Sequence, residues 1–474
     1  MLMTRPFPNK LIIPISIIIS GIFLLFNNYG YSFLFIPLLL IIILIYTNRQ
    51  IIVYASILLM ISFTRFGFNE SRDMITYSFV LFLFFLFLKE YGFNFSGYPH
   101  LPKSVIYFLI LFIGTITIST IGSKNPEESF LPYFRTFVFL VICYIYYSFI
   151  NKVSVVFMFL YMIILAQIVV GFSIYDQFIG SGFSFILANG VLARFSGFYA
   201  NPNIVGLIIV ITTCIILGFF FLQDFKSRYK KVLLSLLLLN NLLITILTDS
   251  RAAIIAMIFC GGFILFVFNR KVFIKAIIGT ILIASLLMLI PSVNDLVTIL
   301  LRLEARSVRP YLWDSGYQVF LKNWLTGVGP EQFKYYQFTY LPSYIIKLLV
   351  DTGNLAWGKT PSPHNFILLM AAENGILGVF SVLSLCVLYF YLNIRSMLYF
   401  KSRNKDLYIL MITFFTAGIG IFWRSFFEIS GIMNYGYMST DLPFWILMIT
   451  MTYLYKNKET LIIDKHPEIL SSPG

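Results

Sequence analysis

The sequence predicts an all-α polytopic integral membrane protein with a large extracytoplasmic loop of short helices. Its 474 residues are 59% hydrophobic and only 11% charged, and the mean hydropathy is +0.88. A soluble domain is about a quarter charged, so this composition excludes a soluble globular protein and a disordered one. The apolar residues also form continuous runs without alternation in polarity, which favours membrane-spanning helices over a β-barrel.

About 20 apolar residues cross a bilayer core as a helix, and fourteen stretches of the sequence approach that length. The third and fourth are short, so twelve spans remain an alternative. Arg5 and Lys10 precede the first stretch as in a signal peptide, but no small-residue cleavage site follows, so we expect an uncleaved span. The stretches are 11–26, 31–46, 51–63, 74–88, 104–122, 131–150, 153–175, 203–222, 232–248, 252–268, 272–291, 365–392, 407–422 and 438–455.

The distribution of Lys and Arg predicts the orientation. The connections 223–231, 269–271 and 393–406 are rich in both residues, which places them, and both termini, in the cytoplasm. The net charge of +14 then reflects membrane orientation, and we expect no nucleic-acid partner. We expect one transmembrane domain over 1–474, with the loop 292–364 inserted between late spans as an extracytoplasmic cap. Its aromatic content argues against disorder.

The sequence offers little for metal or cofactor chemistry. Its four cysteines stand inside apolar runs with no CxxC pair, which is typical of small buried hydrophobes. On the outer side we find one histidine, no cysteine and no clustered carboxylates, and nowhere a phosphate-binding glycine loop. We therefore expect no metal and no cofactor.

Arginines at the outer mouths of the spans are candidate functional residues, because charges near the bilayer are costly. Arg251 opens the span at 252–268; the alternative is an interfacial cation paired with Asp249. Arg194 lies in the loop 176–202, where a solvated loop charge is the alternative.

The large loop begins with three more arginines. Arg302, Arg306 and Arg309 recur at helical spacing, which would align them on one face, although Pro310 should stop or begin a helix there. Such a cluster suits a diphosphate, because each guanidinium offers a planar fork. The alternative is a solvated amphipathic helix paired through Glu304.

The loop ends at His364, the only histidine predicted on the outer side. It precedes a long apolar run, so it can act as a general base at a helix start; a capping or packing role is the alternative. Glu373 follows roughly 13 Å further along the helix, and we expect the Asn374–Gly375 pair to loosen the helix there.

These features together resemble the O-antigen ligase and O-antigen polymerase superfamily. Three local matches carry the resemblance: Ser250-Arg251 at a helix mouth; Arg309 and Trp313 followed by the NWLTGVGP stretch at 323–330; and the segment 364–378, which begins HN and contains ENGILG. They cover roughly 194–378, and the remainder of the chain matches only in hydropathy.

The resemblance implies a glycosyltransferase that uses a glycan on undecaprenyl diphosphate, at the outer face of the bacterial cytoplasmic membrane, without metal or nucleotide. It implies that Arg251 and Arg309 hold the diphosphate and that His364 activates the acceptor hydroxyl or orients the donor. An arginine of the shorter outer loop, used by polymerases, corresponds to Arg194. An R-x10-G pattern of some polymerases is not met, because the glycine comes one position late, at Gly206.

We expect His364, Arg309 and Arg251 as catalytic residues. Arg194, Arg302, Arg306, Glu373, Trp313 and Tyr311 are expected to bind substrate, the aromatic rings by packing on sugar faces unless they serve the core of the loop. The leading hypothesis is a polymerase of lipid-linked repeat units, with a chain-length regulator as a candidate partner. The alternatives are an O-antigen ligase, which transfers the finished glycan to a lipid A core or another acceptor, and a lipid-linked glycan flippase or transporter.

Overall fold

The computed structural model describes residues 49–62, 69–93, 97–184, 193–199, 201–288, 308–351 and 362–463. The predicted spans at 11–26 and 31–46 lie outside these residues. Every other predicted span corresponds to a helix. The helices at these spans are α3 (Arg49–Ser62), α4 (Asn69–Tyr91), α5 (Lys103–Gly122), α6 (Pro126–Phe149), α7 (Val153–Gly180), α8 (Pro202–Phe221), α9 (Arg228–Thr248), α10 (Arg251–Phe268), α11 (Arg270–Met288), α16 (Phe366–Phe400), α17 (Lys405–Ser425) and α18 (Met438–Lys456).

The prediction of an all-helical polytopic membrane protein is confirmed. Eight helices in the described part of the chain are long and apolar enough to cross a membrane: α5 to α10, α16 and α17. The count of fourteen or twelve spans is not confirmed. The short helix α3 contributes an apolar segment, Ile52–Ser62.

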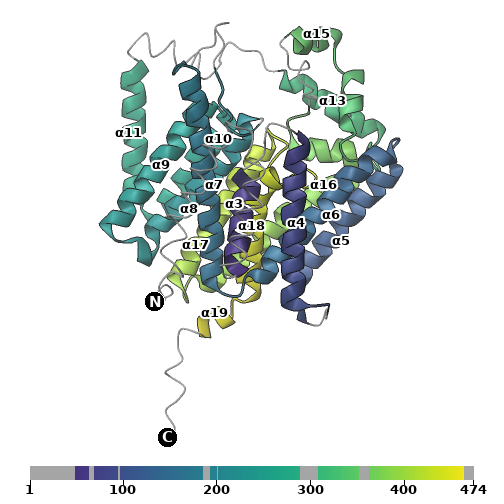
Figure 1. Cartoon of the computed structure of the whole chain (residues 1–474). Coiled ribbons are helices and arrows are strands. Elements are labelled where there is room, and N and C mark those ends of the chain that lie inside the picture. The colour runs from purple at the N-terminus through teal and green to yellow at the C-terminus, as the bar shows by residue number, and fades with distance from the viewer. Residues whose placement is uncertain are drawn as a thin grey trace.

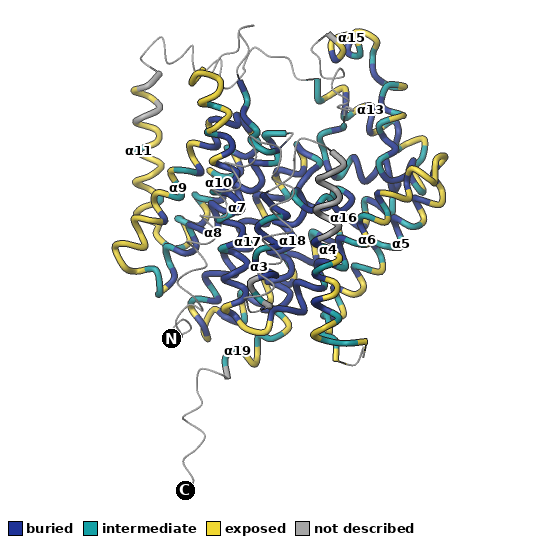
Figure 2. The backbone as a smooth tube through the Cα atoms, viewed as in Figure 1, coloured by how far each residue is buried: buried dark blue, intermediate teal, exposed yellow. Residues whose placement is uncertain are grey.

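The most buried helices form the centre of the bundle (Figures 1 and 2). α8 is apolar on all sides, as expected of a helix surrounded by others, and it packs against α7, α9, α10 and α17. α16 packs against α5, α17 and α18. α11 has an exposed apolar surface and packs against α10 at one edge. This edge therefore presents hydrophobic side chains to the membrane.

Polar side chains add hydrogen bonds between the central helices. The Asn241 amide donates to the hydroxyls of Thr212 and Thr213 over 3.0 and 3.1 Å, which joins α9 to α8. Tyr389 donates to the carbonyl of Phe414 over 2.7 Å, which joins α16 to α17. In a membrane such bonds contribute to helix association, where burial from water does not.

The described part of the loop 292–364 folds into short helices at one end of the bundle (Figure 1). These helices are α13 (Arg309–Lys322), α14 (Phe333–Tyr336), the 3-10 helix η3 (Gln337–Thr339) and α15 (Ser343–Asp351). α13 packs on the beginning of α16. α8, α10, α16 and α18 begin at this end of the bundle, and α9 and α17 end here. Helix ends carry backbone N–H and C=O groups without helical partners, and we therefore call this end the polar end.

Candidate functional site

The polar end is organised around the carboxylate of Glu428, in the connection between α17 and α18. Its side chain is only 2% exposed. Arg309 donates from Nη2 to Oε1 of Glu428 over 3.0 Å, and Nδ1 of His364 lies 3.5 Å from Oε2. The side-chain amide of Asn203 also donates to Oε1. One carboxylate thus brings together three segments that are far apart in the sequence.

Arg194 joins this network through Asn203. Its Nη2 donates to Oδ1 of Asn203 over 2.8 Å, and its Nε donates to the carbonyl of Thr248 over 3.2 Å. The same Nε lies 4.0 Å from Oδ2 of Asp249. Arg194 therefore links the start of α8 to the end of α9, one hydrogen bond away from Glu428.

Arg424, the next-to-last residue of α17, holds the network from inside the bundle. Its side chain is fully buried, and it donates to the carbonyls of Ser430, over 3.0 Å, and Asn203. These bonds fasten the connection that carries Glu428 to the start of α8. A buried guanidinium needs such partners, because an unpaired buried charge is costly.

Opposing effects determine the charge of Glu428. Burial alone would raise the pKa of its carboxyl group, because the ionised form loses its hydration. The neighbouring imidazole of His364, together with the charges of Arg424 and Arg309, outweighs burial and holds the pKa of Glu428 below its usual value. Glu428 is thus an anion at neutral pH.

The backbone at His364 positions its imidazole at the start of α16. His364 has φ of 46°, a left-handed conformation that is uncommon for residues other than glycine. The next residue, Asn365, caps the helix, and its side chain accepts from the N–H of Leu368 over 3.0 Å. The chain therefore turns sharply just before the cap. Backbone strain of this kind is concentrated at functional sites.

Arg309 stands at the first position of α13, with Pro310 in the first turn. Proline has no N–H to donate and its φ suits a helix start. Of the two predicted roles of Pro310, to stop or to begin a helix, the structure shows that it begins one. Arg309 and His364 thus both lie at helix starts, and α13 and α16 pack together.

An interlock between the stretch 323–330 and α16 fixes these two helix starts relative to each other. α16 has a break in its helical geometry at Gly375, with φ of 63° and ψ of −154°, which confirms the expected loosening at Asn374–Gly375. The N–H groups of Val328 and Gly329 donate to the carbonyls of Ala372 and Glu373 over 3.0 and 2.9 Å. These bonds satisfy carbonyls that the break leaves without helical partners.

A further hydrogen bond of the interlock runs from α16 to the 323–330 stretch, and two positions of the interlock require glycine. The N–H of Ile376 donates to the carbonyl of Trp324 over 2.7 Å. A Cβ atom at Gly327 would lie 2.2 Å from the carbonyl carbon of Glu373, and one at Gly375 would lie 2.4 Å from the carbonyl oxygen of Leu325. The two glycine-containing motifs are therefore two halves of one structural feature.

Glu373 belongs to this interlock. Its side chain is buried, and Oε1 accepts from the N–H of Phe333 over 3.1 Å. Its backbone carbonyl also accepts from the hydroxyl of Ser119 over 2.6 Å. Glu373 thus joins α16 to α14 through its side chain and to α5 through its backbone carbonyl.

Arg251 lies at the first position of α10, where its side chain is exposed. It follows Asp249, which lies near Arg194 and has φ of 44°. Gly206 of α8 allows the start of α10 to approach, because a Cβ atom there would lie 2.9 Å from Oγ of Ser250. Arg251 is therefore on the same side of the bundle end as Arg194.

An aromatic groove of about 510 Å³ adjoins the Glu428 network. It lies between α13, the first turns of α16 and Phe426, with one acidic side chain, Asp314, in its lining. Trp313 lines it and packs near Phe427 at a ring distance of 6.4 Å. Tyr311 packs instead against Tyr344, at 5.8 Å.

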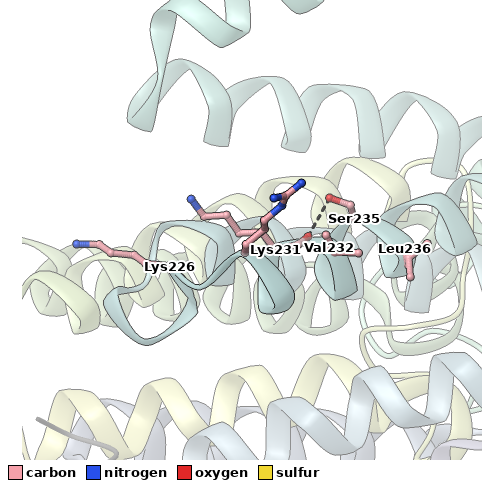
Figure 3. A pocket seen from close by; sticks show the side chains of 6 residues that line it. Lys226, Lys231, Val232, Ser235 and Leu236 are labelled. Atoms are coloured by element: carbon pink, nitrogen blue, oxygen red, sulfur yellow. Dashed lines mark hydrogen bonds between the residues drawn. The ribbon is translucent and has the colours of Figure 1, made fainter.

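A second groove, of about 430 Å³, lies at the opposite end of α9 (Figure 3). Lys226, Arg228 and Lys231 line it together with Val232, Ser235 and Leu236. Seventeen residues of α9 separate Lys231 from Thr248, so this basic groove is about 25 Å from the contact between Arg194 and Thr248. It belongs to the connection predicted to be cytoplasmic.

Two of the residues predicted to bind substrate, Arg302 and Arg306, lie outside the described residues. The structure brings together Arg309, His364 and Arg194, and it adds Glu428, Arg424 and Asn203, which sequence reasoning missed. The available signal was the spacing of Arg424 and Glu428, four residues apart in a connection between two late spans. Among the described residues, no group of three or more His, Cys, Asp or Glu side chains is placed to hold a metal ion.

A search of curated proteins finds no match to this chain. Comparison with family models finds that residues 233–383 match the family described as O-antigen ligase. The matched segment contains Arg251, Arg309, His364 and both halves of the interlock, while Arg194, Arg424 and Glu428 lie outside it. Residues 233–383 of this multi-pass membrane protein are thus similar to the family described as O-antigen ligase.

Proposed function

We propose that the protein is a membrane glycosyltransferase that polymerises oligosaccharide repeat units linked to undecaprenyl diphosphate. The product would be an O antigen or a related cell-envelope polysaccharide. The observation that supports this most is the gathering of Arg309, His364 and Arg194 around Glu428 at one end of the bundle. Guanidinium groups suit a diphosphate, and an imidazole beside them suits a hydroxyl nucleophile.

In the proposed reaction a sugar hydroxyl of the acceptor attacks the anomeric carbon of the donor glycan. The bond between that carbon and the diphosphate oxygen breaks, and its electron pair leaves with the lipid diphosphate. His364 takes the hydroxyl proton. Arg309 and Arg251 offset the charge that develops on the leaving group, as preorganised donors do. Neither a metal ion nor a nucleotide takes part in these steps.

The substrate would lie across the polar end of the bundle. Arg194 supports the polymerase assignment, because the polymerases of the resembled superfamily use an arginine of the shorter outer loop. Trp313 in the aromatic groove would pack on a sugar face, and Tyr311 would extend that surface. Arg302 and Arg306 are proposed as further diphosphate ligands from their place in the sequence alone.

The proposed topology has fourteen spans, or twelve, with both termini in the cytoplasm of a bacterium. The polar end and the cap at 292–364 would face outward, where lipid-linked repeat units are polymerised. The excess of Lys and Arg in the connections 223–231 and 393–406 supports this orientation. A chain-length regulator is a candidate protein partner.

A transfer assay with a purified lipid-linked donor tests this function. We expect the full-length protein to convert the donor into a ladder of lengthening lipid-linked glycans. Arg309→Ala and His364→Ala should abolish the ladder while the protein still inserts in the membrane, because the first loses a diphosphate ligand and the second loses the base. Near-normal products from both variants would refute the proposal.

The description of the matched family favours a second function, that of a ligase. A ligase would transfer a finished glycan once, to a lipid A core or another acceptor. In the same assay, a single product that appears only when a foreign acceptor is added would indicate ligation. A ladder in the absence of a foreign acceptor would indicate polymerisation.

A further inference from the structure

We propose that Glu428 is a positioning residue that holds His364 with its proton on Nδ1 and with Nε2 directed to the acceptor hydroxyl. This inference rests on the proposed function. It begins from the geometry: Oε2 of Glu428 lies 3.5 Å from Nδ1 of His364, and the carboxylate is almost completely buried. An acceptor-only group at Nδ1 selects the tautomer in which that nitrogen carries the proton.

The carboxylate is itself held in place on its other side. Oε1 accepts hydrogen bonds from Arg309 and Asn203, so only Oε2 faces the imidazole. Arg424, four residues earlier, fixes the same connection to the start of α8. Because Glu428 is anchored by three elements, rotation away from His364 would break those bonds. The distance of 3.5 Å is long for a hydrogen bond, but such bonds often tighten when substrate binds.

The arrangement follows the logic of a base oriented by a buried carboxylate, in which the carboxylate also stabilises the imidazolium that forms. The charged and titratable groups that face Glu428 are His364, Arg309 and Arg424. The two arginines disfavour an imidazolium at His364, and Glu428 is the group that offsets them. Loss of its charge should therefore destabilise the imidazolium that forms at His364 and leave the imidazole free to rotate.

The test is the pH profile of kcat in the full-length protein carrying Glu428→Gln. A base must be neutral to accept a proton, so we expect the pH profile to have an acid limb on which activity rises with pH. We expect the variant to lose about 100-fold or more in kcat, and its acid limb to move to lower pH by about one unit. Glu428→Asp keeps the charge, so its acid limb should stay in place while kcat falls less.

Asp441→Asn is the matched control for a structural effect. Asp441 is another fully buried carboxylate, but it accepts from the N–H of Asn434 over 2.6 Å, away from His364. We expect this variant to reduce the yield of folded protein without moving the acid limb. If Glu428→Gln behaves like Asp441→Asn, with an unmoved acid limb, the positioning role is refuted.

A measurement on the unaltered protein keeps the proposal testable even if Glu428 variants do not fold. The chain has three histidines, so ¹⁵N-histidine labelling gives few signals, and His364→Asn identifies the one of interest. We expect the neutral imidazole of His364 to carry its proton on Nδ1 and to leave Nε2 bare. The opposite tautomer would overturn the proposal. A fully active His364→Ala would instead refute the role of His364 in the proposed function, and so the two failures are distinguishable.

Discussion

Glu428 keeps its negative charge inside the protein because cations surround it. A carboxyl group whose pKa is lower in the folded than in the unfolded protein stabilises the fold above the unfolded value, and this stability is lost as pH falls through the folded value. The neighbours of Glu428 lower its pKa in this way.

We therefore expect acidification below about pH 4 to reduce the stability advantage of the unaltered protein over Glu428→Gln. Thermal unfolding midpoints in detergent, recorded from neutral pH downward by tryptophan fluorescence, measure that advantage. A difference between the two proteins that stays constant to the lowest pH would contradict the prediction.

Arg309 provides a prediction about donor binding. Arg309→Lys keeps the charge but loses the planar fork that matches paired phosphate oxygens. We expect the KM for the lipid-linked donor to rise about tenfold, which corresponds to the loss of one hydrogen bond to a charged group, about 1.5 kcal/mol. Arg403→Lys, exposed beyond the far end of α16, is the control and should leave KM unchanged. An unchanged KM in Arg309→Lys would exclude bidentate binding by Arg309.

At the residue scale, the sequence identifies candidate functional residues but does not show which side chains contact them. Arg309 and His364 can be singled out because each is a polar residue where an apolar run begins or a loop opens. Glu428 cannot be singled out in the same way, since a glutamate in a short connection usually is a solvated charge. Its contacts with α8, α13 and the start of α16 exist only after the chain has folded.

Among the elements, the interlock between 323–330 and α16 has a stringent steric requirement. Gly327 has φ of 70°, and a Cβ atom there would meet the backbone of Glu373. Gly182 has nearly the same φ, 68°, but nothing lies within 4 Å of the corresponding position. Substitution of Gly182 by alanine therefore tests the energetic cost of the positive φ alone. Substitution of Gly327 tests that cost together with a steric clash against the backbone of Glu373.

We expect Gly182→Ala to cost about 1 kcal/mol of stability, from backbone strain alone. Gly327→Ala should cost more than that, and it should also lower kcat, because displacement of the 323–330 stretch moves α13 and Arg309. Unfolding in detergent and the transfer assay measure the two effects. Equal stability losses in the two variants would show that the interlock is not tightly packed.

Hydropathy predicts the helices well because each span must satisfy its backbone groups internally. The boundaries of α5, α8, α10 and α18 differ from the predicted spans by few residues. The docking of 323–330 on α16 cannot be predicted from hydropathy in this way, because it depends on backbone groups of two motifs and not on the polarity of their side chains. The sequence displays the glycines but not the hydrogen bonds that require them.

At the scale of the whole molecule, the proposed orientation can be tested with a pair of exposed lysines. Lys347 lies in α15 near the polar end, and Lys226 lines the basic groove at the opposite end of α9. In a Cys386→Ala background the other cysteines are buried. We expect Lys347→Cys to react with an impermeant maleimide in intact cells, and Lys226→Cys to react only after lysis. The reverse pattern would place the polar end in the cytoplasm.

The composition of the polar end has a consequence for the charge balance of the proposed reaction. Among the described residues next to Glu428 and Asp249, four arginines (194, 251, 309 and 424) against these two carboxylates leave two positive charges, with His364 neutral. A glycan on a lipid diphosphate brings about two negative charges, so the occupied site would be near neutrality. Departure of the sugar leaves about one more negative charge on the diphosphate, and the proton that His364 accepts offsets it. The site would therefore pass from substrate to product with no change in total charge, which matters most next to a membrane, where uncompensated charge is poorly screened.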